Sequence, residues 1–406
     1  MFDQQAVTFE ALQSPHWQWT RRAAEACGVV LMIQDTSELD FTRHANTAEL
    51  GPIGNGGGRG LLRHSTLAVD PAGTGRVLGL AYQKLFCRRS TPAQETRTER
   101  KRRPRESQIW PQSVVQVGSA SAQKRWIHVC DRYADNFEMF AACRQTQVDF
   151  LVRVAQDRRA APGHAATHPG EPSDHLLQWA HSLPAGGEKE LTLRSRPNRK
   201  ARQVRLSVAF APVSVFPPGL EREPHAPLRC WLVRVWEADP PAGEDLIDWV
   251  LLTSVAVMEL EQALTVADWY SLRWLVEEYH KCLKSGCSVE QRQLQQADRL
   301  EPCNGLLVVV AVRLEQLKLT AKAEPNRSAL EGGSAEHVRV PAAYRGCSAE
   351  DWTVHTFWCE VAKLSGFLAR KSDGDPGWQT LWRGWQKLDL MTLGASLIQK
   401  EDRSCG

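Results

Sequence analysis

Three apolar segments follow one another, the last two across a short turn, and they limit the chain to a small set of folds. GVVLMI, residues 28–33, has the unbroken apolar pattern of a buried β-strand. LLRHSTLAVD (61–70) and RVLGLAYQKLF (76–86) predict two more strands, joined by the turn PAGTG. Strands joined by so short a turn pair antiparallel. The sequence therefore predicts a sheet that begins with consecutive antiparallel strands.

A strand, a helix and another strand follow this unit. RWIHVCD (125–131) and DFLVRVA (149–155) are apolar strand patterns, and residues 136–144 between them predict a helix. A strand–helix–strand unit after an antiparallel meander predicts a mixed α/β sheet covered by helices. From about residue 157 to 254, Pro- and Gly-rich loops alternate with strands of period two, which predicts an all-β insertion. Helical periodicity resumes near residue 259 and returns in the C-terminal segments 348–369 and 377–390.

The segment YSLRWLVEEYHKCLKSG places four functional side chains in one row. On a helix of about 100° per residue, these side chains fall on one face; they are Tyr270, Arg273, Glu277 and Lys284. The opposite face is apolar and predicts burial; it consists of Leu272, Leu275, Val276, Tyr279 and Leu283. A solvated face with i, i+4 ion pairs is the alternative interpretation of the polar row. His280 and Lys281 are predicted to lie on the surface.

Two isolated carboxylates follow predicted buried strands. Asp35 comes directly after the first strand, and Asp131 comes directly after the strand expected beside it. Each residue alone could be a helix cap or turn residue. Together with Glu277 from a helix packed on the same sheet, they could meet at one point. Converging carboxylates repel one another, so a pair of divalent ions, Mg²⁺ or Mn²⁺, would be the natural counter-charge.

Composition adds little about partners and argues against several protein classes. Hydrophobic residues make up 42% of the sequence and charged residues 24%, as in a folded globular protein. The net charge of +3 is small, but basic residues concentrate in segments 88–105 and 193–205, which suit a phosphate backbone or a solvated loop. Eleven scattered cysteines indicate neither a disulfide framework nor a zinc site. No leader or membrane-spanning run is found, which favours the cytoplasm.

The spacing Tyr-x2-Arg-x3-Glu-x6-Lys carries a family resemblance. With QDTSELDF around Asp35 and CDRYAD around Asp131, it resembles the DDE transposases of the bacterial insertion-sequence-four family, which includes the transposon-five enzyme. The resemblance runs from about residue 10 nearly to the end and includes GWQTLWRGW, residues 377–385. It implies an RNase H-like catalytic core interrupted by a β-rich insertion, in a cytoplasmic enzyme that acts at the bacterial nucleoid.

The resemblance also implies a domain organisation and a reaction. The implied parts are a remnant of an N-terminal region (1–25), the first part of the core (26–156), the insertion (157–254), the second part with the catalytic Glu (255–315) and a C-terminal helical region (316–406). Asp35, Asp131 and Glu277 would hold two Mg²⁺ or Mn²⁺ ions. The enzyme would nick DNA at the transposon end, form a hairpin and transfer the strand into target DNA.

Five side chains are implied to contact DNA. Arg and Lys suit phosphates, and an aromatic face suits a flipped base; the residues are Tyr270, Arg273, Lys284, Arg132 and Trp249. Trp249 could instead be a strand residue packed in a core, and Arg132 could pair with a neighbouring acid. The Trp378, Trp382 and Trp385 stripe is typical of a helix core, although the family uses its C-terminal helices to join two transposase molecules.

One departure from the family leaves three interpretations open. Most of the N-terminal end-binding domain is expected to be missing, because Met1 lies only about 30 residues before the first catalytic strand. The chain could be an active DDE transposase, an inactive or inhibitory fragment that acts by dimerisation, or a structure-selective nuclease on the same scaffold. The intact acids and the Tyr-Arg-Glu-Lys row favour the first interpretation.

Overall fold

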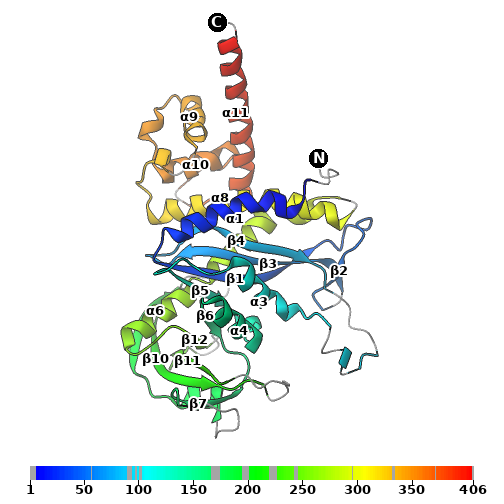
Figure 1. Ribbon diagram of the computed structural model, residues 1–406. Helices are drawn as coiled ribbons and strands as arrows, with labels where there is room; N and C mark the ends of the chain where they lie inside the picture. The colour runs from blue at the N-terminus through cyan, green and yellow to red at the C-terminus, as the bar shows by residue number, and fades with distance from the viewer. Residues whose placement is uncertain are drawn as a thin grey trace.

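The computed structural model describes residues 6–404 except 56, 89–93, 97, 100–102, 166–173, 194–200, 219–225, 242–245, 295, 332–333 and 371. Its strands form one continuous sheet that runs through both halves of the body. Helices cover this sheet, and a separate helical region stands at one end of the molecule (Figure 1). The chain therefore has a mixed α/β fold, as the sequence predicts.

The first half of the sheet contains the predicted strands in the predicted directions. β1 (Val29–Asp40) pairs antiparallel with β3 (Gly58–Asp70) and parallel with β5 (Arg125–Cys130). β6 (Asp149–Arg153) is parallel to β5, and β4 (Arg76–Phe86) is antiparallel to β3. The short β2 (Gly51–Ile53) pairs with the first residues of β3. Three antiparallel strands followed by two parallel ones, with helices on the faces, fit an RNase H-like core.

The second half of the sheet is joined to the first through β12 (Asp248–Thr253), which pairs antiparallel with β6. β11 (Leu228–Glu237) and β10 (Arg202–Val215) continue the antiparallel order. The remaining elements are β7 (Arg159–Pro162), β8 (Asp174–His175), α5 (Leu176–Ser182) and β9 (Gly187–Leu193). The all-β prediction is therefore wrong in one respect: α5 forms because Leu176 and Ala180 are buried in the local core.

Helices bury both faces of the first half. Leu31 and Ile33 of β1 share one core with Leu275 of α7 and Val308 of α8 (Ala297–Ala323). On the other side, α3 (Ile109–Val117) and α4 (Phe137–Thr146) pack on β5, β6 and neighbouring strands. Asn136 accepts a hydrogen bond from the Met139 amide (2.8 Å) and thereby caps α4. α1 (Phe9–Glu25) lies on β4 and α8 (Figure 1).

The predicted continuous helix over residues 270–284 is wrong. The chain forms α6 (Leu260–Ser271), a turn at 272–273, α7 (Trp274–Lys281) and a π-helical turn at Cys282–Gly286. α6 contacts β10 and β11, whereas α7 contacts β1 and β3, so the break lets the chain follow two parts of a twisted sheet. The predicted apolar face is confirmed, since Leu272, Leu275, Val276, Tyr279 and Leu283 are all buried.

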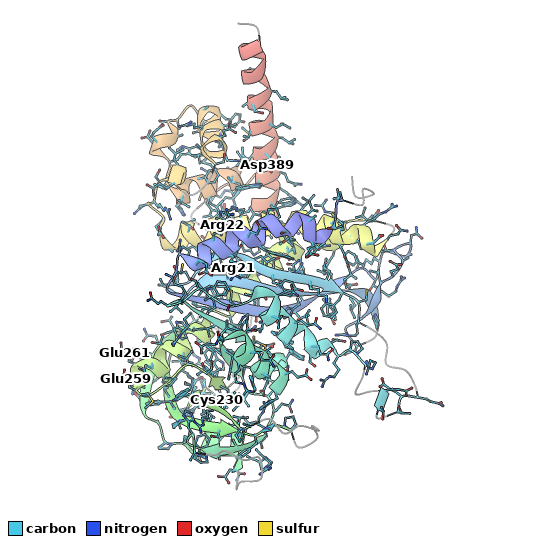
Figure 2. All side chains as sticks on the ribbon, viewed as in Figure 1. Arg21, Arg22, Cys230, Glu259, Glu261 and Asp389 are labelled. Carbon is cyan, nitrogen blue, oxygen red and sulfur yellow. The ribbon has the colours of Figure 1, made fainter. Side chains whose placement is uncertain are left out.

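The C-terminal helices form a region with its own small core. Its helices are α9 (Ala335–Tyr344), α10 (Val354–Leu364) and α11 (Trp378–Ser404). Val338, Phe357 and Leu388 meet in this core, and His337 Nε2 contacts Asp389 Oδ1 at 2.9 Å, which ties α9 to α11. Figure 2 labels Asp389 on α11, and Figure 1 shows α11 projecting away from the body. None of the described helices is long and apolar enough to cross a membrane.

Candidate active site

Asp35 lies inside β1, not after it, which corrects the predicted strand end. The strand continues to Asp40 because β3 pairs with it throughout, and Asp35 stands directly opposite Ser65. Directly opposed residues of an antiparallel pair point to the same face of the sheet. Asp35 and Ser65 therefore both face the helical layer that contains α7.

Asp131 follows β5 at the same level as Asp35. Ile33 of β1 and Val129 of β5 are register partners. Asp35 comes two residues after Ile33, and Asp131 comes two residues after Val129. The Asp131 carboxylate accepts a hydrogen bond from the Tyr133 amide (2.9 Å), which starts the 3-10 turn Arg132–Ala134. Parallel pairing thus brings both acids to one place in the sheet, as the sequence predicts for neighbouring strands.

The two acids have opposite pKa shifts. Burial and the nearby charge of Asp35 raise the pKa of Asp131 above its ordinary value. Burial also opposes ionisation of Asp35, but the hydrogen bond from His280 and the positive charge of Arg273 outweigh it, so the pKa of Asp35 is lowered. Two carboxylates that repel one another in a partly buried place are a site that a cation would stabilise.

The polar row of the sequence is divided by the helix break. Tyr270 lies in the last turn of α6 and is buried, which corrects its predicted place on an outward face; it packs here because α6 lies against the sheet. Arg273 lies in the turn and donates a hydrogen bond to the Glu277 carboxylate on α7. Lys284 lies in the π-helical turn, with its Nζ 3.7 Å from Glu290 Oε1. The Arg273–Glu277 pair matches the i, i+4 ion pairing that the alternative interpretation, a solvated helix face, predicts. Arg273 also acts electrostatically on Asp35 and Asp131.

His280 is the clearest error of the sequence interpretation. The sequence predicts it on the surface, but only 5% of it is exposed, because the α7 turn that carries it lies over β1 and β3. Its Nδ1 lies 3.5 Å from Asp35 Oδ2, and its Nε2 lies 3.2 Å from Ser65 Oγ. Burial lowers the pKa of His280 to about 4, so the imidazole is neutral at neutral pH. Lys281 is exposed, as predicted.

Aromatic and basic side chains surround the acids. Trp249 of β12 is half-buried and meets Tyr270 edge to face, with ring centroids 5.2 Å apart. Arg132 is exposed next to Asp131. The adjacent Tyr133, which the sequence interpretation did not single out, has 82% of its surface exposed. The turn that carries Arg132 and Tyr133 is held in place by the buried Asp135 carboxylate. This carboxylate accepts hydrogen bonds from the backbone amides of Ala155 and Gln156, each at 2.7 Å.

A buried polar network lies behind the Asp35 strand and was also missed. Gln34 Nε2 lies 2.6 Å from His128 Nδ1, and Gln34 Oε1 lies 3.0 Å from His64 Nε2. His64 Nδ1 lies 2.8 Å from the Thr36 hydroxyl. Burial lowers the pKa of both histidines to about 3. The network links β1, β3 and β5 on the face opposite Asp35, because successive strand residues alternate between faces.

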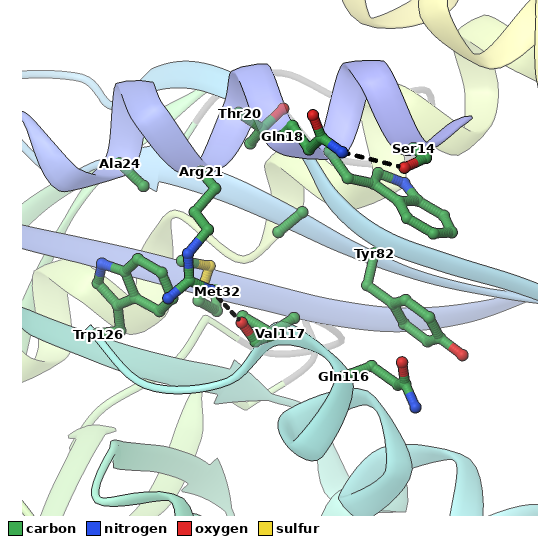
Figure 3. Close-up of a pocket in the computed structure, with 12 residues that line it drawn as sticks. Ser14, Gln18, Thr20, Arg21, Ala24, Met32, Tyr82, Gln116, Val117 and Trp126 are labelled. Carbon is green, nitrogen blue, oxygen red and sulfur yellow. Dashed lines mark hydrogen bonds between the residues drawn. The ribbon is translucent and has the colours of Figure 1, made fainter. Parts of the chain in front are cut away.

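A small cavity of about 170 Å³ lies elsewhere, between α1, α3 and the sheet (Figure 3). Arg21 of α1 crosses it, with its guanidinium carbon 4.9 Å from the centre of the Trp126 ring, and donates to the Val117 carbonyl (2.8 Å). Ser14, Gln18 and Tyr82 line the same space. The cavity shares no residue with the acid cluster.

The residues fit a divalent metal in donor chemistry. Carboxylate oxygens are the ligands that Mg²⁺ and Mn²⁺ prefer, and the mutual repulsion of Asp35 and Asp131 is what such an ion offsets. Glu277 is engaged by Arg273, and within the described residues no three His, Cys, Asp or Glu side chains gather closely enough to hold a metal. Asp35 and Asp131 are close enough for the charge of Asp35 to raise the pKa of Asp131, but the described structure does not bring Glu277 together with them, because Glu277 is paired with Arg273.

About half of the residues in the two basic runs lie outside the part of the chain that the structure describes. Within the described part of 88–105, Arg88 pairs with Glu106 and Glu38, and Arg105 pairs with Glu138. Most of segment 193–205 is likewise not described. The cysteines of the described part are free.

The family is shown by comparison with known proteins. The family model described as the transposase DDE domain matches residues 100–302, half of the chain, and this range includes Asp131 and Glu277. The chain belongs to the transposase DDE-domain family. Membership supports transposase function, with phosphoryl transfer on DNA as its chemistry and a divalent ion as the cofactor that such enzymes generally use.

Proposed function

We propose that this protein is a cut-and-paste transposase of the insertion-sequence-four type, similar to the transposon-five enzyme. It would nick DNA at the transposon end, form a hairpin, reopen it and join the ends to target DNA at the bacterial nucleoid. The observation that carries the proposal is that Asp35 and Asp131 each lie two residues beyond a register partner, Ile33 and Val129, and so at the same level of the sheet. The Arg273–Glu277 pair beside these acids supports it.

Asp35, Asp131 and Glu277 are proposed to hold the metal ions. Two Mg²⁺ or Mn²⁺ ions, when bound, supply charge stabilisation to the attacking and leaving oxygens of phosphoryl transfer. Arg273 is proposed to exchange its partner: a DNA phosphate competes with the Glu277 carboxylate for the guanidinium, because both accept charge-assisted hydrogen bonds. DNA binding would thereby free Glu277 to act with the two aspartates.

Other side chains are proposed to hold the DNA. Lys284 supplies a mobile positive charge for a phosphate, and the exposed Arg132 lies next to Asp131 to do the same. Trp249 is proposed to stack on a base that leaves the duplex as the hairpin forms. Tyr270 supports it from below, since the edge-to-face contact fixes the orientation of the indole ring.

A homodimer on DNA is proposed to form through α11. Leu390, Leu393 and Leu397 recur at i, i+3 and i+7 on one side of this helix and are 68, 57 and 55% exposed. Such a stripe on a helix that projects from the body is suited to pairing with a second helix (Figure 1). Two molecules would then hold the two transposon ends together.

The test is excision, in cells, of a marker placed between the terminal repeats that flank the gene. Excision is expected with the wild-type chain and is expected to disappear with Glu277→Gln. Glu278→Gln is a matched control, because Glu278 lies next in sequence but pairs with Lys318 (3.0 Å) on α8. Equal excision by wild type and Glu277→Gln would refute the active-site assignment. Cleavage of purified DNA that ignores the terminal repeat sequence would instead indicate a structure-selective nuclease.

A further inference from the structure

His280 joins two strands of the sheet at the proposed catalytic acid. Asp35 and Ser65 are opposed across the β1–β3 pair, and the imidazole of His280 comes down from α7 between them. Its two ring nitrogens contact one residue each, Asp35 Oδ2 at 3.5 Å and Ser65 Oγ at 3.2 Å. All three side chains are fixed by regular secondary structure, so their arrangement is built into the fold.

The chemistry of the partners decides where the imidazole proton lies. A neutral imidazole has one N–H, and an ionised carboxylate can only accept a hydrogen bond. The proton must therefore be on Nδ1, facing Asp35, and Nε2 must accept from the Ser65 hydroxyl. Ser65 Oγ also lies 3.3 Å from Gln83 Oε1, an amide oxygen that accepts from Tyr279 at 2.7 Å and has a second lone pair for Ser65. The Ser65 hydroxyl has one hydrogen, and its contact with His280 Nε2, at 3.2 Å, is the shorter of the two.

The same arrangement of Asp, His and Ser also occurs in enzymes with a serine nucleophile, but burial excludes that role here. Ser65 has no exposed surface, and it lies under α7. No substrate carbonyl or phosphate can approach its Oγ in this fold. Of the three contacting residues, Ser65 points into the protein, and Asp35 is the one at the proposed active site.

We propose that His280 is a positioning residue for Asp35, and that Ser65 acts through it by keeping the imidazole proton on Nδ1. The contact between His280 Nδ1 and Asp35 Oδ2, at 3.5 Å, restricts the rotation of the Asp35 carboxylate before any cation or DNA binds. The proposal rests on the proposed function in so far as Asp35 is taken to hold a metal ion. A fixed carboxylate binds a cation more tightly than a rotating one, because less freedom is lost on binding.

Two amide substitutions of His280 distinguish a role in orienting Asp35 from a role in filling the buried space. The amide nitrogen of Asn occupies the place of histidine Nδ1, so His280→Asn keeps a donor for Asp35. The amide of Gln reaches the place of Nε2, so His280→Gln keeps a partner for Ser65 and loses the donor. Both variants put a neutral amide in the same buried position. Far-UV circular dichroism and the Tm of each variant establish that it folds.

The first measurement is Mn²⁺ binding by the purified full-length chain without DNA, followed by electron paramagnetic resonance. His280→Gln is expected to weaken binding about 10-fold or more, as for other residues that orient a metal ligand, and His280→Asn about 3-fold or less. Ser65→Ala is expected to fall between them. Unchanged binding in folded His280→Gln, or equal weakening by the Asn and Gln variants, would overturn the positioning role.

The second measurement needs neither metal nor DNA, so it remains decisive if the proposed function fails. In ¹⁵N-histidine NMR spectra, the signal that is missing from His280→Gln is expected to be a neutral ring protonated on Nδ1. Ser65→Ala is expected to shift part of the population to the Nε2-protonated form. A ring protonated on Nε2 in the wild type would refute the relay. Absence of DNA cleavage together with an Nδ1-protonated ring would refute the transposase proposal alone.

Discussion

Arg273 donates to the Glu277 carboxylate one helical turn further along the chain, and 53% of the Glu277 side chain is still exposed. The pair lies at the helix break, beside Asp35 and Asp131, and not on a straight solvated helix. Because Glu277 is largely exposed, its ion pair contributes only about 0–1 kcal/mol to folding. A variant that lacks the Glu277 charge should therefore still fold, so its effect on the proposed reaction can be measured separately from its effect on stability.

The first prediction concerns Glu277→Gln. The amide keeps the size of the side chain and removes the charge that we propose to act on the metal ions. Strand cleavage of a transposon-end duplex is expected to fall at least about 100-fold, while the Tm changes by about 1 °C or less. Glu278→Gln should show the reverse pattern, with cleavage kept and Tm lowered, because Glu278 pairs with Lys318. A cleavage loss that is the same in both variants would contradict the prediction.

The second prediction concerns Trp249 and hairpin formation. Trp249→Ala removes the ring that stands edge to face on Tyr270, and stacking on a base is worth roughly 1–3 kcal/mol. Hairpin formation on a pre-nicked duplex is expected to slow about 5- to 100-fold, with first-strand nicking nearly unchanged. Trp249→Phe should restore much of the rate. Equal slowing of both steps would indicate that Trp249 only packs against Tyr270.

The third prediction uses the raised pKa of Asp131. Burial and the charge of Asp35 disfavour the ionised form, so at neutral pH the charged carboxylate destabilises the fold. Asp131→Asn keeps the acceptor for the Tyr133 amide and removes that charge. The Tm without divalent ions is expected to rise by about 1–3 °C. Asp40→Asn is the control, because the pKa of Asp40 is lowered and its removal should not stabilise the protein.

Sequence patterns predicted the strands well because burial leaves a strong signal in them. Residues 28–33, 61–70 and 76–86 are apolar, and each forms part of a strand. The end of β1 could not be predicted, because the strand continues through the polar residues from Gln34 to Glu38. Only the ladder with β3 holds that part in a strand, and a partner distant in sequence leaves no local pattern.

Part of the candidate site could be predicted from the sequence for the same reason. Asp35 and Asp131 each come two residues after the register partners Ile33 and Val129 of two neighbouring parallel strands, so their similar level in the sheet follows from strand order. His280 was assigned to the surface because it is near a polar helix face, and its burial depends on β3 below it. α8 was not predicted as a 27-residue helix, since Pro302, Asn304 and Gly305 interrupt the helical pattern before the apolar run that follows.

The fourth prediction concerns the exposed leucine stripe of α11. Replacing Leu393 and Leu397 with Glu is expected to leave the fold intact, because both side chains face outward. The paired complex of two transposon ends in a native gel should weaken at least about 10-fold, while binding of one end is kept. As a control, Leu388→Ala should lower the Tm, because Leu388 is buried in the C-terminal core. A paired complex that forms equally well in the double variant would place the dimer contact elsewhere.

The last prediction concerns the buried network of His64 and His128 behind the strand that carries Asp35. The pKa of each is lowered from 6.5 to about 3, so below pH 6.5 the unfolded chain takes up protons that the folded chain does not. The free energy of unfolding should therefore fall as pH decreases from 6.5, by up to about 1.4 kcal/mol per pH unit for each histidine. Carboxyl groups whose pKa is raised by burial, such as those of Asp131 and Glu315, act on the slope with the opposite sign, so the comparison of wild type with a histidine variant carries the test.

Urea unfolding at pH 7, 6 and 5 measures this slope. His128→Asn keeps an acceptor at the Nδ1 position for Gln34 but cannot be protonated there, so it should lose a measurable part of the pH dependence. His175→Asn is the control, because 63% of the His175 side chain is exposed and its removal should leave the slope as it is. An identical slope in wild type and His128→Asn would mean that the network opens before the rest of the sheet. In that case the strand that carries Asp35 would be less stable than its burial implies.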